Sequence, residues 1–286
     1  MGVDFHQHLW PSEVSELLRR RSAPPMLRGR TLVLPIGGPF ELDPASYAPE
    51  ARLAELDRSG VDAAVVSLPP TCEPTPDVIA AWHAVAPRLA ESSAGRLIPL
   101  AYRSVRPGFA GAIVSAADLS DLDELAPLLD RLEAAGRLLF VHPGPAPIAD
   151  RGWWAAGVAY VCQMQVAYAA WIAAGPVRWP RLRVVFALLG GGAPFQVERL
   201  VRRGVAAAAP FVPNLWFETS SYGERALELS LQTFGAGCLL FGSDAPIDRV
   251  SEARRVVASF GPTLENRLLT SNAAAALGGE RRAWAA

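Results

Sequence analysis

The chain contains only four histidines, and three of them stand where they could hold a metal ion. His6 and His8 are two positions apart in the apolar stretch VDFHQHLW, residues 3–10. Side chains of a β-strand alternate between faces, so both imidazoles point the same way while Gln7 points the opposite way. His142 ends another apolar run, just before Pro-Gly. Neutral imidazole is a common ligand of zinc and its neighbours, so these residues indicate a metal site.

Apolar strand-like stretches recur along the chain and alternate with helical segments. Their apolar runs are nearly continuous, which is typical of parallel strands that are covered on both faces. We predict eight strands, over residues 3–10, 61–68, 96–102, 111–116, 137–142, 182–189, 215–220 and 238–244. Helices are expected between them, over residues 49–59, 76–91, 121–135, 194–203 and 224–234. The pattern predicts an α/β fold, a (β/α)8 TIM barrel that forms one domain over residues 1–286.

The connection after the first strand is unusually long, from residue 9 to residue 48. Ser12 is a plausible N-cap for a short helix that runs to Arg21. The stretch TLVLPIGGPFEL is interrupted by Gly-Gly and could form a β-hairpin. Long connections in compact domains are usually functional, so we expect this insertion to act as a lid.

The carboxyl ends of all strands share one mouth in such a barrel. His6 and His8 end the first strand, His142 ends the fifth, and Asp244 ends the eighth. Three imidazoles and one carboxylate at this rim would form a mononuclear site for zinc or manganese. Taken singly, His142 could cap the turn before Pro143, and Asp244 could cap the helix after the last strand.

Two further features have structural explanations. His83 lies in AAWHAVA on an outer helix, where we expect a structural or surface residue. Gly190, Gly191 and Gly192 follow the sixth strand without the Lys-Ser/Thr of a phosphate-binding loop, so they predict a tight turn.

Composition excludes several classes of function. The net charge is −1, which gives no support for binding nucleic acid or an anionic membrane. All 27 basic residues are arginine, so Schiff-base chemistry and a carboxylated lysine that bridges two metals are excluded. Cys72, Cys162 and Cys238 are odd in number and form no CxxC motif. Together with the absence of a visible export signal, they favour a reduced, cytoplasmic location.

Residues 152–177 contain no charge and are long enough to span a bilayer. Gln163 and Gln165 lie in the middle of this stretch, and Gly157 and Gly175 interrupt it. A membrane helix is therefore the weaker interpretation. We expect a helix that packs on the barrel and against a second subunit.

Several motifs resemble the amidohydrolase superfamily, in the branch that includes aminocarboxymuconate-semialdehyde decarboxylase and the resorcylate-type decarboxylases. They are DFHQH, LAELDRSGVDAAVVS, LLFVHPG, RLRVVFALLGGGAPFQVERL, NLWFETSSYG, LLFGSDAP and NRLLTSNAAAALG. The resemblance implies one divalent metal ion, zinc before manganese, at His6, His8, His142 and Asp244. It also implies a cytoplasmic enzyme that is often a homodimer, in which Asp244 handles the proton.

One position departs from that family. Its sixth strand usually ends FAHLGG, with a histidine that orients or deprotonates the metal-bound water, whereas this chain has Leu188 there. Zinc lowers the pKa of its water to about 7, so hydrolysis remains feasible without that base. Alternatively, Leu188 marks a reaction without water, such as decarboxylation. A metal-free lactonase would also fit this substitution, as would a catalytically degenerate barrel with a binding or assembly role.

Other residues near the mouth could bind a small substrate. Arg103 could hold a carboxylate or form a surface salt bridge. The residues from Glu218 to Tyr222 offer a carboxylate, hydroxyls and a phenol. Trp153, Trp154 and Phe40 could form an aromatic wall, or pack in the core. We therefore expect a small carboxylated, unsaturated or aromatic substrate that is hydrolysed or decarboxylated.

Overall fold

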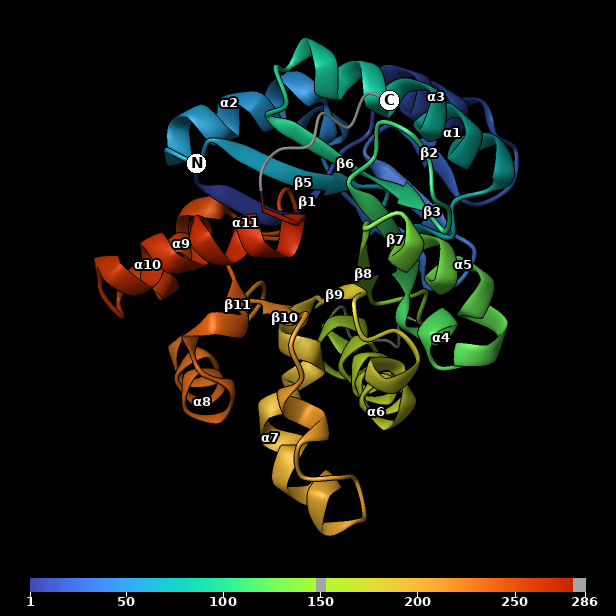
Figure 1. The fold of residues 1–286 in the computed structure, drawn as a ribbon. Helices are drawn as coiled ribbons and strands as arrows, with labels where there is room; N and C mark the ends of the chain where they lie inside the picture. Colours follow the sequence, from blue (N-terminus) through green and yellow to red (C-terminus); the bar gives the residue numbers. More distant parts are fainter. Residues whose placement is uncertain (148–152, 280–286) are drawn as a thin grey trace.

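Eight parallel strands surround a central axis and are themselves surrounded by helices (Figure 1). The computed structural model describes residues 1–147 and 153–279. Neighbouring strands follow the chain order, and each predicted strand has its counterpart. They are β1 (Val3–His8), β5 (Ala63–Ser67), β6 (Leu97–Tyr102), β7 (Gly111–Ser115), β8 (Leu138–His142), β9 (Arg183–Phe186), β10 (Leu215–Glu218) and β11 (Leu239–Leu240). The predicted (β/α)8 barrel is confirmed.

The barrel closes where β1 meets the segment that follows β11. The amide of Phe5 donates to the carbonyl of Phe241 at 2.8 Å, and the amide of His8 donates to that of Ala245 at 2.7 Å. In return, the amide of Asp244 donates to the carbonyl of His6 at 2.9 Å. The first and last strands are therefore held side by side, although they lie at opposite ends of the sequence.

The helices pack against the outside of the strands, and local capping signals define several of their ends. Helix α2 ends at Gly60, which adopts the left-handed conformation (φ 64°), as glycine does readily. Helix α5 begins after Asp121, whose carboxylate accepts hydrogen bonds from the amides of Asp123 and Glu124. The helices are α1 (Ser12–Arg20), α2 (Pro49–Ser59), α3 (Pro76–Ser92), α4 (Ala116–Leu119), α5 (Leu122–Ala134), α6 (Tyr160–Arg178), α7 (Leu188–Arg202), α8 (Glu224–Phe234), α9 (Val250–Ala258), α10 (Pro262–Leu269) and α11 (Ser271–Leu277).

The long connection between β1 and β5 carries a small antiparallel sheet of its own. Strands β3 (Thr31–Leu34) and β4 (Gly38–Glu41) form the hairpin that the Gly-Gly pattern predicts. Strand β2 (Met26–Arg28), which the sequence did not indicate, pairs with the other side of β3. We call these three strands the insertion sheet.

The chain makes a tight left-handed turn between β9 and the regular part of α7. Residues 188–192 all have positive φ values, from 47° to 79°. Glycine is required at the crossing with α6, because a Cβ atom on Gly191 would lie 2.5 Å from the carbonyl oxygen of Val161. The turn predicted from the glycine run is confirmed.

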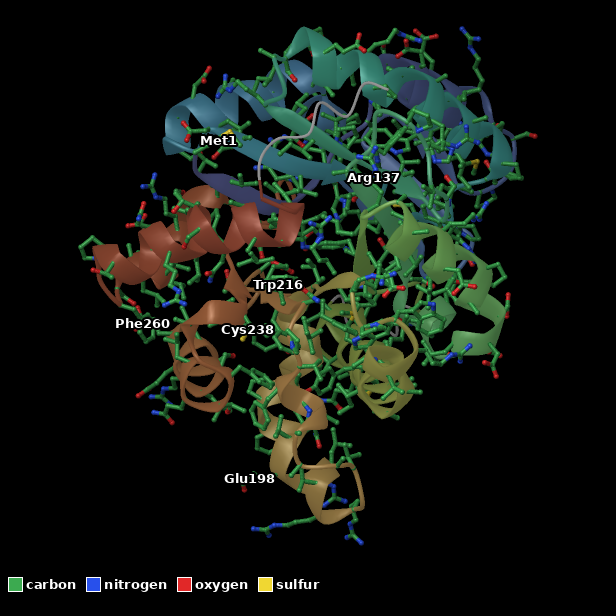
Figure 2. The ribbon with its side chains drawn as sticks, in the orientation of Figure 1. Met1, Arg137, Glu198, Trp216, Cys238 and Phe260 are labelled. Atoms are coloured by element: carbon green, nitrogen blue, oxygen red, sulfur yellow. The ribbon has the colours of Figure 1, made fainter. Side chains whose placement is uncertain are left out.

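The uncharged stretch forms a π-helical turn (Ala155–Ala159) followed by α6, while residue 152 lies outside the described residues. Met164, Tyr168 and Trp171 are buried against the barrel. Within the two described ranges, no helix combines the length and the apolar character that a membrane span requires. Figure 2 shows the side chains that fill the space between the strands and the helices, and Glu198 on α7, which points away from the barrel.

Candidate metal centre

Four side chains from three strand ends meet at the mouth of the barrel. The Nε2 atom of His8 lies 3.3 Å from Nε2 of His6 and 3.2 Å from Nε2 of His142. The Oδ1 atom of Asp244 lies 3.2 Å from Nε2 of His8 and 3.4 Å from Nε2 of His6. All four ligand atoms lie within 4.8 Å of one another. The convergence that the strand order predicts is therefore present.

The second ring nitrogen of each histidine has an acceptor, and this fixes the orientation of the ring. Nδ1 of His142 donates to the carbonyl of Pro143 at 2.8 Å, and Nδ1 of His8 lies 3.4 Å from the carbonyl of Ser67. Nδ1 of His6 lies 3.1 Å from Oε1 of Glu218. Because these acceptors are hydrogen-bonded to the Nδ1 side of each ring, the Nε2 atoms face one another, as in metal-binding histidines.

This donor set fits a divalent metal ion. Ligands at the usual zinc–nitrogen distance of about 2.0–2.1 Å in a tetrahedral shell are about 3.3–3.4 Å apart, which is close to the four distances given above. Oδ1 of Asp244 is buried and accepts no hydrogen bond from the residues described. Lone pairs and a carboxylate that face one another in a buried site repel; the proton on His6 relieves part of this repulsion in the metal-free protein, and a bound cation would take the place of that proton.

The charges around His6 set its protonation in the metal-free protein. Burial alone would lower the pKa of His6, but the carboxylates of Asp244 and Glu218 outweigh burial and raise it to about 9. Burial lowers the pKa of His8, and burial with the two neighbouring imidazoles takes that of His142 well below its usual value. Burial opposes ionisation of Asp244, yet the nearby histidines lower its pKa to about 2.

Glu218 is fully buried behind His6 and does not line the pocket. Its carboxylate also accepts hydrogen bonds from the amide of Leu188 at 2.7 Å and from the amide and hydroxyl of Ser220. A Cβ atom on Gly242 would lie 1.9 Å from Oε2 of Glu218, so glycine leaves the room that this carboxylate occupies. The sequence suggested Glu218 as a substrate ligand, whereas its position is that of a group that orients His6.

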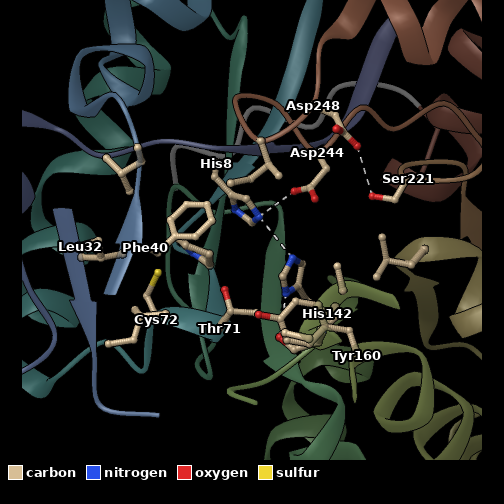
Figure 3. Close-up of a pocket in the computed structure, with 18 of the residues that line it drawn as sticks. His8, Leu32, Phe40, Thr71, Cys72, His142, Tyr160, Ser221, Asp244 and Asp248 are labelled. Carbon is tan, nitrogen blue, oxygen red and sulfur yellow. Dashed lines mark hydrogen bonds and ion pairs between the residues drawn. The ribbon is translucent and has the colours of Figure 1, made fainter. Parts of the chain in front are cut away.

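A pocket of about 440 Å³ opens at the ligand cluster, and three of the four ligands line it (Figure 3). His8, His142 and Asp244 form its inner end. The insertion sheet forms much of the opposite wall, where Figure 3 shows Leu32 and Phe40. Most of the surface that lines the pocket is apolar. Its polar members outside the metal ligands include Thr71, Tyr160, Ser221, Tyr222 and Asp248.

The predicted substrate residues divide between the pocket and the surface. Tyr222 and Phe40 line the pocket, as expected. Arg103 is not among the lining residues, because its guanidinium forms an ion pair with Asp118 at 2.6 Å. The sequence allowed Arg103 either to hold a substrate carboxylate or to form a surface salt bridge, and the structure contains the salt bridge. Trp153 and Trp154 lie beside each other and are 56% and 39% exposed, outside the lining of the pocket.

His83 has the structural role that the sequence predicts. Its Nε2 accepts a hydrogen bond from the amide of Tyr102 at 3.0 Å, and its ring makes an edge contact with Phe109. Burial lowers the pKa of His83 to about 4. This histidine on α3 is therefore a neutral hydrogen-bond acceptor at neutral pH, apart from the metal centre.

Sequence reasoning missed the groups that surround the ligands. Ser67 and Pro143 position two imidazoles through their backbone carbonyls, which no side-chain pattern indicates. Asp248 lines the pocket, and its carboxylate accepts a hydrogen bond from Ser221 at 3.4 Å. Its signal in the sequence was only its place four residues after Asp244.

Comparison with known proteins agrees with this geometry. A curated relative, 2-amino-3-carboxymuconate-6-semialdehyde decarboxylase of Dictyostelium discoideum, is 25% identical and matches 85% of this chain and 80% of its own. The structure of 5-carboxyvanillate decarboxylase from Sphingomonas paucimobilis superimposes with a TM-score of 0.72, 19% identity and coverage of 98% and 99% of the two chains.

A second 5-carboxyvanillate decarboxylase, from Novosphingobium aromaticivorans, was solved with manganese and 4-hydroxy-3-methoxy-5-nitrobenzoic acid. It has a TM-score of 0.71 and 16% identity, and the match covers 97% of this chain and 96% of the other. The amidohydrolase family model matches residues 3–279, which is nearly the whole chain. The protein therefore belongs to the amidohydrolase family, as its motifs predict.

Proposed function

We propose that this protein is a metal-dependent decarboxylase of small aromatic or conjugated carboxylic acids. The observation that carries the proposal is the convergence of three imidazole Nε2 atoms and the carboxylate of Asp244 at the inner end of a mostly apolar pocket. The decarboxylases named above, which share the fold, support the choice of reaction. A bound divalent ion would supply Lewis-acid polarisation of a substrate oxygen.

His6, His8, His142 and Asp244 would hold that ion, which we propose to be zinc or manganese. Zinc suits the three imidazoles, and manganese is present in the Novosphingobium structure. Decarboxylation breaks the bond from the ring carbon to the carboxylate, releases CO2 and leaves the electron pair on that carbon, which then takes up a proton. We assign this proton transfer to Asp244, whose carboxylate lies at the inner end of the pocket: it would take the proton from the hydroxyl group of the substrate and deliver it to that carbon.

Leu188 supports a reaction that does not use water. It is buried, lines the pocket and stands at the position for which the family motif leads us to expect a histidine. A positioned general base contributes about 10²–10⁴ to a hydrolytic rate, whereas an apolar side chain excludes water from the reacting carbon. Tyr222 and Tyr160 offer phenolic hydroxyls to the polar substituents of the substrate.

The proposal is tested by metal analysis and by CO2 release. Protein purified without chelator should contain about one equivalent of a divalent metal, and it should release CO2 from members of a panel of hydroxybenzoates. Chelation and Asp244→Asn should each abolish the release. Lactone hydrolysis that persists in chelated protein would instead support a metal-free lactonase. Activity that emerges only in Leu188→His would support a degenerate barrel.

We also propose that the protein is a cytoplasmic homodimer that pairs through α6. Val166 and Val177 are 57% and 86% exposed and lie on one side of this helix, because they are about three turns apart. Two exposed valines on a helix whose only charged residue is Arg178 favour burial in a subunit interface. Cys72, Cys162 and Cys238 are free thiols, compatible with a reducing compartment. Light scattering should give the mass of two chains for the unmodified protein and the mass of one chain for Val166→Glu.

A further inference from the structure

The pocket carries negative but no positive side-chain charge among the residues described. Its two charged lining residues are Asp244 and Asp248, and no described arginine contributes to its surface. The chain has no lysine to take that role. Arg103, the cation that the sequence placed nearest the mouth, is paired with Asp118. Among the described residues, a substrate in this pocket therefore meets no cation, and its only cationic contact there would be the metal.

The metal centre has no surplus positive charge for a second anionic group. Metal-bound imidazoles are neutral, so the ligands contribute the single negative charge of Asp244. Glu218 adds another negative charge directly behind His6, at 3.1 Å. Together these two carboxylates match the charge of a divalent ion. Asp248, whose backbone amide donates to the carbonyl of Asp244, adds a further carboxylate beside the centre.

The part of the pocket wall that the insertion sheet contributes is apolar. Phe40 and Ile247 line the pocket and are 39% and 50% exposed, so they mark its outer edge. Their contacts suit a hydrocarbon or aromatic surface and provide no donor for an anion. The apolar residues that line the pocket include Leu32, Leu34, Phe40, Leu42, Val161, Leu188 and Ile247.

On this basis, and resting on the proposed decarboxylation, we propose that the substrate carries a single acid group, the one that reaches the metal, on an apolar or aromatic body. A second carboxylate would be desolvated with only hydroxyl donors such as Tyr160 and Tyr222 to face it and no cation among the described lining residues, which is costly for a charge. It would also lie in a pocket that already contains Asp248, and like charges at close range repel. The pocket thus selects monocarboxylates and rejects dicarboxylates such as 5-carboxyvanillate, from which two of the similar structures take their name.

The test compares two acids that differ in one substituent. The first is 5-carboxyvanillate, and the second is 2-hydroxy-3-methoxy-5-methylbenzoate, in which a methyl group replaces the distal carboxylate. Calorimetry on the manganese-loaded full chain measures the Kd of each acid. We expect the methyl compound to bind about 100-fold more tightly, because the distal carboxylate finds no cation. Affinities within threefold of each other, or no binding of either acid, would overturn the inference.

Variants at the rim test the cause of the selectivity. Ile247→Arg should strengthen binding of 5-carboxyvanillate at least about tenfold without strengthening binding of the methyl compound. The matched control Ile36→Arg adds the same charge at an exposed residue outside the pocket lining and should change neither affinity by more than about threefold. Asp248→Asn should reduce the ratio between the Kd values of the two acids. An unchanged difference in both Ile247→Arg and Asp248→Asn would overturn the electrostatic explanation.

Two further outcomes separate this inference from the proposed reaction. Monoacids that bind more tightly but release no CO2 would contradict decarboxylation and leave the selectivity in place. Release of CO2 from 5-carboxyvanillate at a rate similar to that of its methyl counterpart would uphold the reaction and overturn the selectivity. Arg151 lies outside the described residues. Tight binding of 5-carboxyvanillate that Arg151→Gln abolishes would also overturn the inference, because a cation would then serve the distal carboxylate.

Discussion

The two ends of the pocket differ in how firmly their side chains are held. At the inner end, His6, His8 and His142 are buried at strand ends, and each ring has a hydrogen-bond partner on its second nitrogen. At the outer end, Phe40 comes from the insertion sheet and Ile247 from the loop after the last strand, and both are half exposed. The inner end is preorganised, and the outer end has room to adjust.

This difference assigns separate tasks to the two ends. A metal site must hold its ligands within a few tenths of an ångström, so it belongs on strands whose register is fixed by the barrel. Selectivity depends on shape and charge at the wall, which can change on loops without disturbing the strands. Changes at the inner end should therefore affect metal binding and chemistry, and changes at the outer end should affect substrate affinity.

The largest effect is expected from Asp244→Asn. The amide keeps the shape but removes the ligand charge and the group to which we assign proton transfer, so CO2 release should fall at least about 10³-fold. Metal content after dialysis should fall as well. The control Asp57→Asn, at an exposed ion pair with Arg96, should leave CO2 release and metal content unchanged. Full metal content and activity in Asp244→Asn would contradict the assignment of the inner end.

Glu218→Gln tests whether metal binding at the inner end depends on the hydrogen bonds that orient His6. Glu218 accepts from four donors, and an amide would turn its NH2 group toward at least one of them. Metal affinity should fall about 10–100-fold, as it does when such supporting partners are lost. Competition with a fluorescent chelator measures this affinity. Glu224→Gln, the same change at the exposed start of α8, should have no effect. Equal affinities for the two variants would show that His6 needs no orienting group.

Metal binding should depend on pH through His6. Its pKa of about 9 in the metal-free protein lies above the ordinary 6.5, so His6 is protonated at neutral pH and must lose that proton to bind the ion. Affinity should therefore rise about tenfold per pH unit from pH 7 up to about 9 and then level off. Calorimetry in buffers with different ionisation enthalpies should find about one proton released at pH 7. Release of no proton there would contradict the charge balance around His6.

The smallest effect is expected at the outer end, from Phe40→Ala. Loss of one aromatic contact of about 0.5–1.5 kcal/mol should raise KM about 3–10-fold and leave kcat within twofold. Ile36→Ala is the matched control, because Ile36 lies in the turn of the same hairpin and is 42% exposed but does not line the pocket. Steady-state kinetics on one monocarboxylate measures both variants. A fall in kcat for Phe40→Ala would show that the two ends are not separable.

The inner end could be predicted from the sequence because strand order alone brings its residues together. Apolar runs without polar alternation located the strands, and the ends of parallel strands share one mouth, which gave His6, His8, His142 and Asp244. The outer end could not be predicted in the same way. Its walls depend on how an irregular connection folds back over the barrel, and periodicity carries no information about that path.

Glu218 shows a second limit of sequence reasoning. The sequence placed it correctly at the end of a strand, which suggested the pocket. Its side chain instead extends behind His6, into room that exists because residue 242 is glycine. Such a choice is made by packing between neighbouring strands, and local sequence does not encode it. Arg103 was likewise placed near the correct strand end, but its partner Asp118 lies on a separate helix.

The closure between β1 and the segment after β11 has a consequence for the integrity of the barrel. His6 and His8 stand on one side of this seam and Asp244 on the other, and backbone hydrogen bonds hold the two sides together. An ion that binds all three residues would link the two sides of this seam and oppose local separation of β1 from its neighbour. The same side chains would thus serve both the chemistry at the metal centre and the stability of the barrel.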